Sequence, residues 1–256
     1  MMKKLILVAL ITAPLVAQNY GNYNSAPVAR PQFMRSPVAV KGNIFGDASL
    51  VGWWPMTFGT GSTVRDMSGN GNDGAWSGTK AGTNGYWSAG KIGLWSGYFD
   101  GSSNTVTTAT SSYPSGTAFT VTSWVKIPSS TAAYRLIFAQ GGVMLYINNQ
   151  TSNQVWFQLN GTAHSTSCTV TVASWKHGAL VVSGTSWVAY MNGVQCSSGT
   201  LSTAYSPASG VSYIGSYPPW NGITPWYFGG WISDVRIYNR ALSQAEIAAI
   251  YNAENH

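Results

Sequence analysis

The residues best suited to binding chemistry lie in one segment, 216–228, which is rich in aromatic side chains and prolines. It reads Ser-Tyr-Pro-Pro-Trp-Asn-Gly-Ile-Thr-Pro-Trp-Tyr-Phe. Prolines stiffen the segment, and we do not expect a loop of this composition to bury every ring. An exposed ring can stack on the apolar face of a sugar while nearby polar groups bond its hydroxyls. The segment therefore predicts a ligand site built from Tyr217, Trp220, Asn221, Trp226 and Tyr227.

Two alternatives stay open for this segment. Its rings can pack beneath the loop, or they can anchor a protein partner, because Tyr and Trp are also common at protein interfaces.

A second candidate site is the turn 66–74, in which oxygen-bearing side chains alternate along the chain. They are Asp66, Ser68, Asn70 and Asn72, and a glycine takes the sixth place. This spacing resembles the first half of a calcium loop, although Ser77 stands where such a loop has its bidentate carboxylate. Either Asp66 and Asn70 close Asx turns, or they hold a Ca²⁺ ion together with neighbouring carbonyls.

Catalytic chemistry has few candidate residues. Glycoside hydrolysis normally uses two carboxylates close together, but the two glutamates, Glu246 and Glu254, both lie in the predicted C-terminal helix. No pair of aspartates falls on a predicted strand, and neither His164 nor His177 has a nucleophile elbow or an acidic neighbour in sequence. We expect no catalytic residue and interpret His177 as a core or inter-strand residue.

The chain has two cysteines, Cys168 and Cys196. Export would place them in an oxidising compartment, where a disulfide forms and persists. The sequence therefore favours a Cys168–Cys196 disulfide, with two buried thiols as the alternative.

Short β-strand patterns separated by turn residues must position these candidates. Lys176–Ser183 and Ser186–Met191 are joined by Gly184 and Thr185, which predicts a hairpin, and Asn192-Gly193 predicts a second tight turn. Trp175 and Tyr190 have the size to fill the space between two sheets. About a dozen such strands predict an all-β fold, a two-sheet antiparallel jelly-roll sandwich with a short C-terminal helix.

The helix follows the last strand pattern. Trp231 to Tyr238 alternates with period 2, and the pattern then changes to period 3.6. Ser243 followed by Glu246 is a capping box, which predicts the start of the helix.

Length and composition fit a single large β domain. The chain has 256 residues, of which only 8% are charged, and Gly, Ser, Thr, Asn, Trp and Tyr are abundant. Residues 1–17, with Lys3 and Lys4 before an apolar run, predict a signal peptide. Residues 18–47 are rich in Pro and Asn and predict an extended arm or linker, or an arm that contacts a neighbouring subunit. Residues 48–256 then form the domain.

The formal charge of +6 is a weak sign of nucleic-acid binding, because the Lys and Arg residues are scattered and form no stripe. We expect no nucleic-acid partner and no membrane span once the signal is removed.

Several motifs occur in a characteristic order along the chain. They are Leu50 to Trp54, Asp66 to Gly74, Gly90 to Gly101, Phe119 to Val125, Trp175 to His177, Tyr190 to Val194, and the closing Asp-Val-Arg-Ile-Tyr-Asn-Arg-Ala-Leu. This order, over residues 48 to 253, resembles the laminin-G-like domains of the concanavalin A-like lectin and glucanase superfamily.

The resemblance implies two curved antiparallel sheets, and it implies the fold more firmly than any activity. Many members of the superfamily bind calcium, but Thr57 and Ser233 stand where relatives frequently carry Asp.

The sequence thus favours a secreted, extracellular, non-catalytic lectin-like module that binds a glycan or another surface through loop aromatics. The alternative is a structural subunit of an extracellular assembly or virion surface, which would use the domain and the 18–47 arm in a homo-oligomer.

Overall fold

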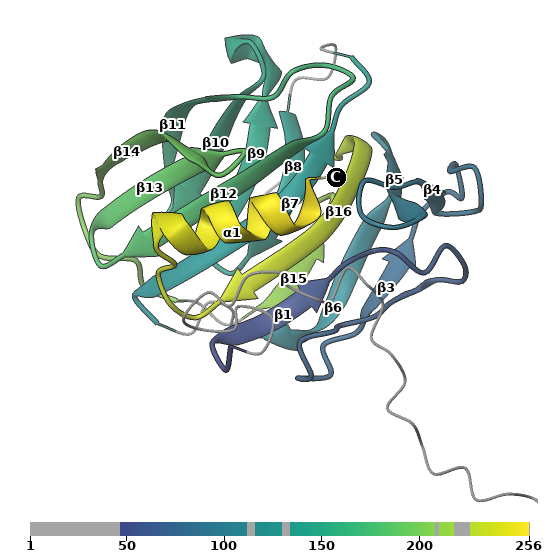
Figure 1. The fold of residues 1–256 in the computed structure, drawn as a ribbon, viewed down its shortest axis with the longest axis horizontal. Coiled ribbons are helices and arrows are strands. Elements are labelled where there is room, and N and C mark those ends of the chain that lie inside the picture. Colours follow the sequence, from purple (N-terminus) through teal and green to yellow (C-terminus); the bar gives the residue numbers. More distant parts are fainter. Residues whose placement is uncertain (1–46, 112–115, 130–133, 208–209, 218–225, 256) are drawn as a thin grey trace, which may run out of the picture.

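The computed structural model describes residues 47–111, 116–129, 134–207, 210–217 and 226–255. Two antiparallel sheets of eight strands each lie face to face as a sandwich, with one α-helix against the outside of one sheet (Figure 1). The predicted fold class is therefore confirmed. None of the helices in these ranges is long and apolar enough to cross a membrane.

The first sheet, sheet A, has the strand order β14-β13-β12-β7-β16-β5-β4, and β1 also pairs with β16. Its strands are β1 (Leu50–Trp54), β4 (Trp87–Ala89), β5 (Trp95–Asp100), β7 (Ala118–Lys126), β12 (Lys176–Ser183), β13 (Ser186–Met191), β14 (Val194–Thr200) and β16 (Gly229–Tyr238).

The second sheet, sheet B, has the order β11-β10-β9-β8-β15-β6-β3-β2. Its strands are β2 (Thr63–Val64), β3 (Gly74–Ser77), β6 (Thr105–Ser111), β8 (Tyr134–Gln140), β9 (Val143–Asn148), β10 (Gln154–Leu159), β11 (Thr162–Thr169) and β15 (Val211–Ile214). A short 3₁₀ helix, η2 (Asn149–Thr151), connects β9 to β10.

The core fills the space between the sheets and follows from the period-2 alternation of each strand. On β10, for example, Val155, Phe157 and Leu159 point inward and are buried in the main core cluster. Trp156, between the first two of them, points to the outer side of sheet B. Each strand of this kind therefore presents a second, independent set of side chains on the outside.

The predicted turns are confirmed. Ser183 pairs with Ser186 across the two-residue loop between β12 and β13. At the next turn Asn192 and Gly193 have φ values of 53° and 78°, and both residues of a primed hairpin turn need a positive φ.

The helix α1 (Gln244–Glu254) begins at the predicted capping box. The Ser243 side chain accepts a hydrogen bond from the Glu246 backbone N–H, and the Glu246 side chain accepts one from the backbone of Ser243. Buried Ile247 and Ile250 pack on the outer face of sheet A against Leu50, Trp53 and Tyr238. The helix thereby covers much of that face (Figure 1).

Two predicted core positions are wrong. Tyr190 packs on the outer side of sheet A in the cluster beneath α1, not between the sheets. Trp175 is half-buried, and its ring lies near the Lys126 ammonium on the same outer face. Strand alternation explains Tyr190, because Ala189 and Met191 beside it pack with the core and Tyr190 points the other way. Trp175 lies before the first residue of β12.

Candidate functional site

The outer face of sheet B carries a cluster of aromatic rings to which segment 216–228 contributes. We call it the aromatic face and define it by Tyr134, Tyr146, Trp156, Tyr217 and Trp226. These five rings pack with Leu136, Ala139 and Met144 in a cluster separate from the core between the sheets. Tyr146 is buried, whereas the other four rings are half-buried and reach the surface.

Trp226 lies at the centre of this cluster. Its ring stacks on Tyr134 with centroids 4.4 Å apart, and it contacts Tyr146 at 5.1 Å. Trp156, on the neighbouring strand, lies 6.4 Å from Tyr146. A predicted loop residue and three strand residues therefore form one continuous surface.

Polar groups fix two of the rings at its rim. The Trp156 indole N–H donates to Thr151 Oγ1 at 3.1 Å, and the Tyr134 hydroxyl donates to Gln150 Oε1 at 3.3 Å. Burial, together with the neighbouring Tyr134, raises the pKa of Tyr146 to about 12, so this phenol stays neutral at physiological pH. The aromatic face is thus rigid and uncharged at its centre.

The predicted site residues fall into two groups. Tyr217 and Trp226 lie on the aromatic face, and the Tyr217 ring also contacts Tyr213 at 6.0 Å. Tyr227 is half-buried next to Trp226. Trp220 and Asn221 lie outside the described residues, as do the predicted signal peptide and all of the 18–47 arm except Asp47.

Sequence reasoning missed the strand residues Tyr134, Tyr146 and Trp156. The signal that could have found them is the alternation of β9 and β10, in which Tyr146 and Trp156 stand between apolar core residues. Once the neighbouring positions are assigned to the core, a large ring at an outward position indicates a candidate surface site.

The Asp66 turn is held by hydrogen bonds within the protein. The Asp66 carboxylate accepts from the backbone N–H groups of Trp53, Ser68 and Asn72 and from the Ser68 hydroxyl, each at 2.9 Å. The Asn70 amide donates to the carbonyl oxygens of Leu50 and Val51.

Four donors therefore point at the carboxylate, as in an Asx turn, and this does not fit a calcium ligand. Within the described residues no group of three His, Cys, Asp or Glu side chains could hold a metal ion. Calcium binding stays a prediction.

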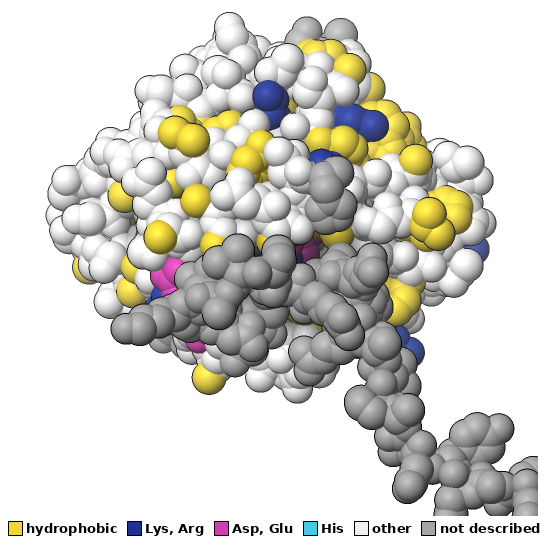
Figure 2. All heavy atoms as spheres, viewed as in Figure 1, with side chains coloured by type: hydrophobic (Ala, Val, Ile, Leu, Met, Phe, Trp, Pro, Cys, Tyr) yellow, Lys and Arg dark blue, Asp and Glu magenta, His cyan; other side chains and the backbone are white. Residues whose placement is uncertain are grey.

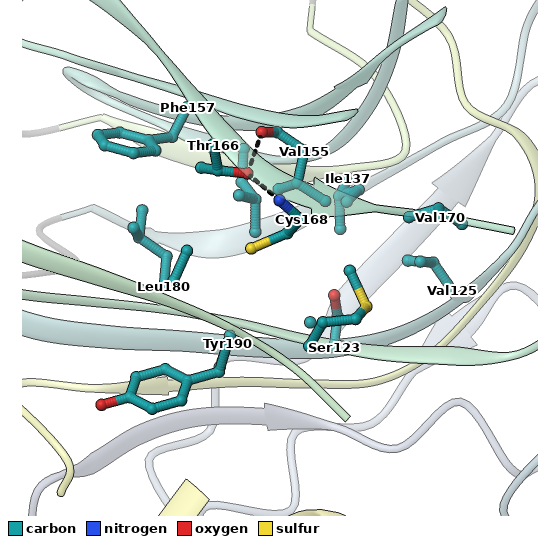
Figure 3. A pocket seen from close by; sticks show the side chains of 15 residues that line it. Ser123, Val125, Ile137, Val155, Phe157, Thr166, Cys168, Val170, Leu180 and Tyr190 are labelled. Carbon is teal, nitrogen blue, oxygen red and sulfur yellow. Dashed lines mark hydrogen bonds between the residues drawn. The ribbon is translucent and has the colours of Figure 1, made fainter. Parts of the chain in front are cut away.

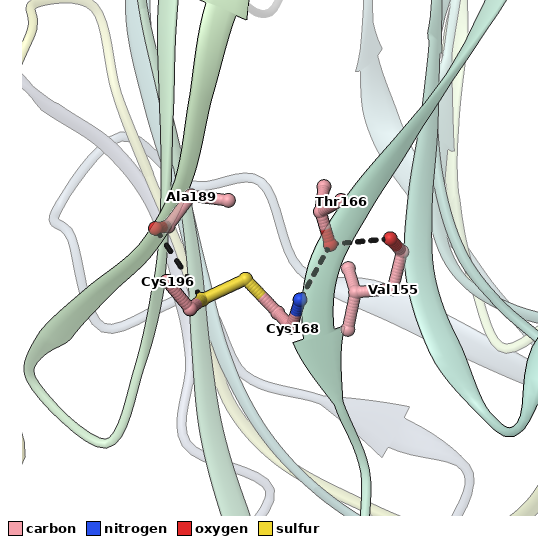
Figure 4. The surroundings of a disulfide bond; sticks show 5 residues. All are labelled: Val155, Thr166, Cys168, Ala189 and Cys196. Carbon is pink, nitrogen blue, oxygen red and sulfur yellow. Dashed lines mark hydrogen bonds between the residues drawn. A yellow bond between two sulfur atoms is a disulfide. The ribbon is translucent and has the colours of Figure 1, made fainter.

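The predicted Cys168–Cys196 disulfide is confirmed (Figure 4). It joins β11 of sheet B to β14 of sheet A, with the two Cα atoms 5.4 Å apart and 28 residues apart in sequence. The Cys168 backbone N–H donates to Thr166 Oγ1, which in turn donates to the Val155 carbonyl. The bond therefore ties an edge strand of one sheet to an edge strand of the other, which suits an oxidising compartment.

Two buried carboxylates meet beneath α1. Asp234 and Glu254 both form salt bridges with Arg236, and all three side chains are buried. The Trp53 indole donates to Asp234 at 2.6 Å, and the Trp124 indole donates to Glu254 at 2.8 Å. We call these three residues the buried ion cluster. The sequence signal for two of them, Asp234 and Arg236, is their Asp-x-Arg spacing on one strand.

Burial and the neighbouring charges act in opposite directions in the buried ion cluster. It raises the pKa of Glu254 well above its usual value, against the opposing effect of Arg236. Burial would lower the pKa of Arg236, but Asp234 and Glu254 outweigh it and raise that pKa. The cluster is closed to substrate by α1, so its chemistry is structural.

The predicted inter-strand position of His177 is confirmed. Its ring is fully buried between Trp124, at 5.3 Å, and Tyr251, at 6.1 Å. Burial first, and then Arg236, lower its pKa to about 3, so the imidazole is neutral in the folded protein.

A small cavity lies between the sheets, near the disulfide (Figure 3). It is about 20 Å³, and apolar side chains such as Val125, Leu145 and Leu180 line it. This volume suffices for about one water molecule and is too small for a sugar ring. This cavity is therefore excluded as a sugar-binding site.

Solved structures with this fold include carbohydrate-related proteins. Domain 4 of AbnA, an extracellular arabinanase from Geobacillus stearothermophilus solved with arabinotriose, matches with a TM-score of 0.57 and 20% identity, covering 79% of this chain and 98% of that domain. Trypanosoma rangeli sialidase with sialic acid matches with a TM-score of 0.60 and 16% identity over 86% of this chain. The binding domain of botulinum neurotoxin DC with SialylT gives 0.60 and 13% over 82%.

At these identities the likeness concerns the fold alone. The chain spans 36% of the sialidase and 52% of the toxin fragment.

The comparison with curated proteins gives no significant match. The family described as the concanavalin A-like lectin/glucanases superfamily, in its laminin-G-like form, matches residues 100–248. This match covers more than half of the chain and agrees with the two-sheet architecture. The chain therefore belongs to the concanavalin A-like lectin and glucanase superfamily and has a lectin-like β-sandwich fold.

Proposed function

We propose that this protein is a secreted, non-catalytic module that binds a neutral glycan on the aromatic face of sheet B. The observation that carries the proposal is the meeting of Trp226, from the predicted loop, with Tyr134 and Trp156 on a surface that the described residues leave partly exposed. Half-buried rings held side by side offer the flat apolar area on which pyranose rings stack.

The polar side chains of this face support a neutral ligand. On β10 the outward neighbours of Trp156 are Gln154 and Gln158, and η2 adds Gln150. Amide groups both donate and accept, which suits sugar hydroxyls. None of the described outward positions of β8, β9 and β10 carries a charge.

The state of the carboxylates supports a non-catalytic role. Glu246 and Asp47 bind Arg240, and Asp66 and Asp100 cap their own turns. Asp234 and Glu254 lie in the buried ion cluster on the other sheet. The aromatic face thus lacks, among its described residues, the paired carboxylates that glycoside hydrolysis uses.

A glycan array of neutral and anionic saccharides, probed with purified wild type and with Trp226→Ala and Trp156→Ala, tests the proposal. We expect neutral glycans to bind and each substitution to weaken binding roughly tenfold, because each removes one stacking ring. Phe58→Ala is the matched control, since Phe58 is an exposed ring, 47% accessible, outside the aromatic face.

The proposal fails if the array retains no neutral glycan, or if both Trp226→Ala and Trp156→Ala bind as well as wild type. Release of reducing ends from a bound polysaccharide would contradict the non-catalytic role.

A further inference from the structure

Helix α1 leaves one end of the outer face of sheet A uncovered, and a row of four large side chains crosses the sheet there. Trp231 on β16 pairs in register with Tyr98 on β5 and with Lys126 on β7. Trp175 lies just before β12, the next strand. We call these four residues the lysine–aromatic row.

The Lys126 ammonium lies between two indole rings in this row. Its Nζ is 4.3 Å from the centroid of Trp231 and 5.3 Å from that of Trp175. On the other side of Trp231, the Tyr98 ring meets it edge to face at 5.3 Å. All four side chains are half-buried, so each keeps a face in solvent.

No carboxylate of the described residues forms a salt bridge with Lys126. Asp100, two residues beyond Tyr98 on β5, is directed into its own turn, where it accepts hydrogen bonds from Ser102, Ser103 and Asn104. The rings hold the cation by cation–π attraction, which leaves its three N–H donors available to a ligand.

The surroundings add positive charge. Lys91 lies with its Nζ 4.9 Å from the Trp124 ring, at the C-terminal end of α1. Figure 2 shows Lys and Arg side chains among hydrophobic ones on this face of sheet A, near the C-terminus of the chain. Aromatic area and positive charge therefore coincide, in contrast to the uncharged aromatic face of sheet B.

We propose that the lysine–aromatic row is a second binding site, one that takes an anionic polysaccharide. The Trp231, Trp175 and Tyr98 rings stack on successive sugar units, and the Lys126 ammonium pairs with a sulfate or carboxylate of the chain. Four neighbouring strands span roughly 14 Å at about 4.8 Å per strand, which suits an extended oligosaccharide better than a single sugar.

A single-stranded nucleic acid would also stack on rings and pair with cations. Proteins that bind one, however, line the whole strand with a positively charged groove, because every nucleotide carries a phosphate. One lysine within the row and a second beside it match a sparsely charged glycan better.

Affinity electrophoresis of the full chain through gels containing chondroitin sulfate, hyaluronan or neutral dextran tests this site. We expect retardation by one or both anionic polymers and none by dextran. The two anionic gels separate sulfate from carboxylate recognition, since hyaluronan carries carboxylates alone. Lys126→Gln should weaken the binding about tenfold, the effect of losing one charge-assisted contact.

Lys80→Gln is the matched control, because Lys80 also lies over an aromatic ring, 5.9 Å from the Tyr86 centroid, but outside the row. Tyr98→Leu should weaken binding as well, and thermal unfolding of each variant verifies that it is folded. Unchanged binding by a folded Lys126→Gln overturns the proposal, and so does equal retardation by dextran or by a further gel that carries immobilised oligo(dT). Trp226→Ala should leave this binding intact, so the test is independent of the aromatic face.

Discussion

The two outer faces of the sandwich have opposite designs. On sheet A, α1 covers an apolar cluster and seals Arg236, Asp234 and Glu254 away from water. On sheet B, the described residues leave the aromatic face partly exposed, and it carries rings and amides in place of ions. The strands of both sheets point alternate residues into the same core. The two outer faces therefore differ only through the residues that point outward.

This contrast separates stability from binding. A buried ion is costly unless each charge keeps its partners, so changes beneath α1 should act on folding. Half-buried rings on an open face lose less packing when they are removed, so changes there should act on ligand affinity.

The largest effect should come from Arg236→Met, which leaves two carboxylates buried without their cation. We expect it to lower the free energy of unfolding by ~3–5 kcal/mol in urea denaturation. Arg65→Met is the control, because its salt bridge with Asp73 is solvent-exposed, with side chains 62% and 36% accessible. Exposed pairs contribute about 0–1 kcal/mol. An equal decrease in the free energy of unfolding for both variants would contradict the stabilising role of the ion pairs beneath α1.

A smaller effect should come from His177→Phe, and it should depend on pH. The pKa of His177 is lowered to about 3, so the unfolded chain takes up a proton near pH 6.5 while the folded protein does not. The contribution of His177 to the free energy of unfolding of the wild type is therefore fully present above pH 6.5 and decreases as the pH falls toward 3.

The Phe variant lacks this loss, and we expect its stability relative to wild type to rise as the pH falls through that window. Asp100 and Glu246, whose pKa values are lowered to about 2, destabilise both proteins equally in acid, so the difference isolates His177. Urea denaturation at pH 7, 5.5 and 4 measures it, and parallel curves for the two proteins would refute this account.

The smallest effect on stability should come from adding or removing calcium. Because the Asp66 carboxylate already accepts four hydrogen bonds, we expect the melting temperature to be the same with excess Ca²⁺ and with chelator. A rise with Ca²⁺ that Asp66→Asn abolishes would instead establish the calcium loop.

Local patterns in the sequence predict much of this fold. The capping box at Ser243 and the turn at Asn192 and Gly193 depend on neighbours in the chain, and the structure confirms them. The pattern from Trp231 does form a strand, but a bulge at Asp234 breaks its alternation, so that Ile232 and Val235 both face the core. The disulfide was also predictable, because a chain with two cysteines allows one pairing.

The candidate site was predictable only in part. Tyr217 and Trp226 come from one conspicuous segment, but Tyr134 and Trp156 join them through strand pairing, which has no local signal. The same reason explains the errors at Trp175 and Tyr190. Ring size indicates burial, but only the register of the sheet determines the side on which a ring lies.

The position of β16 has a consequence for how the protein is made. This strand, near the end of the chain, lies between β7 and β5 and also pairs with β1, so sheet A has a gap at its centre until residues 229–238 are in place. The ribosome adds these residues only after it has synthesised all the other strands of the described chain. We therefore expect sheet A to remain incomplete until these residues are translated, in a form that a chaperone can hold.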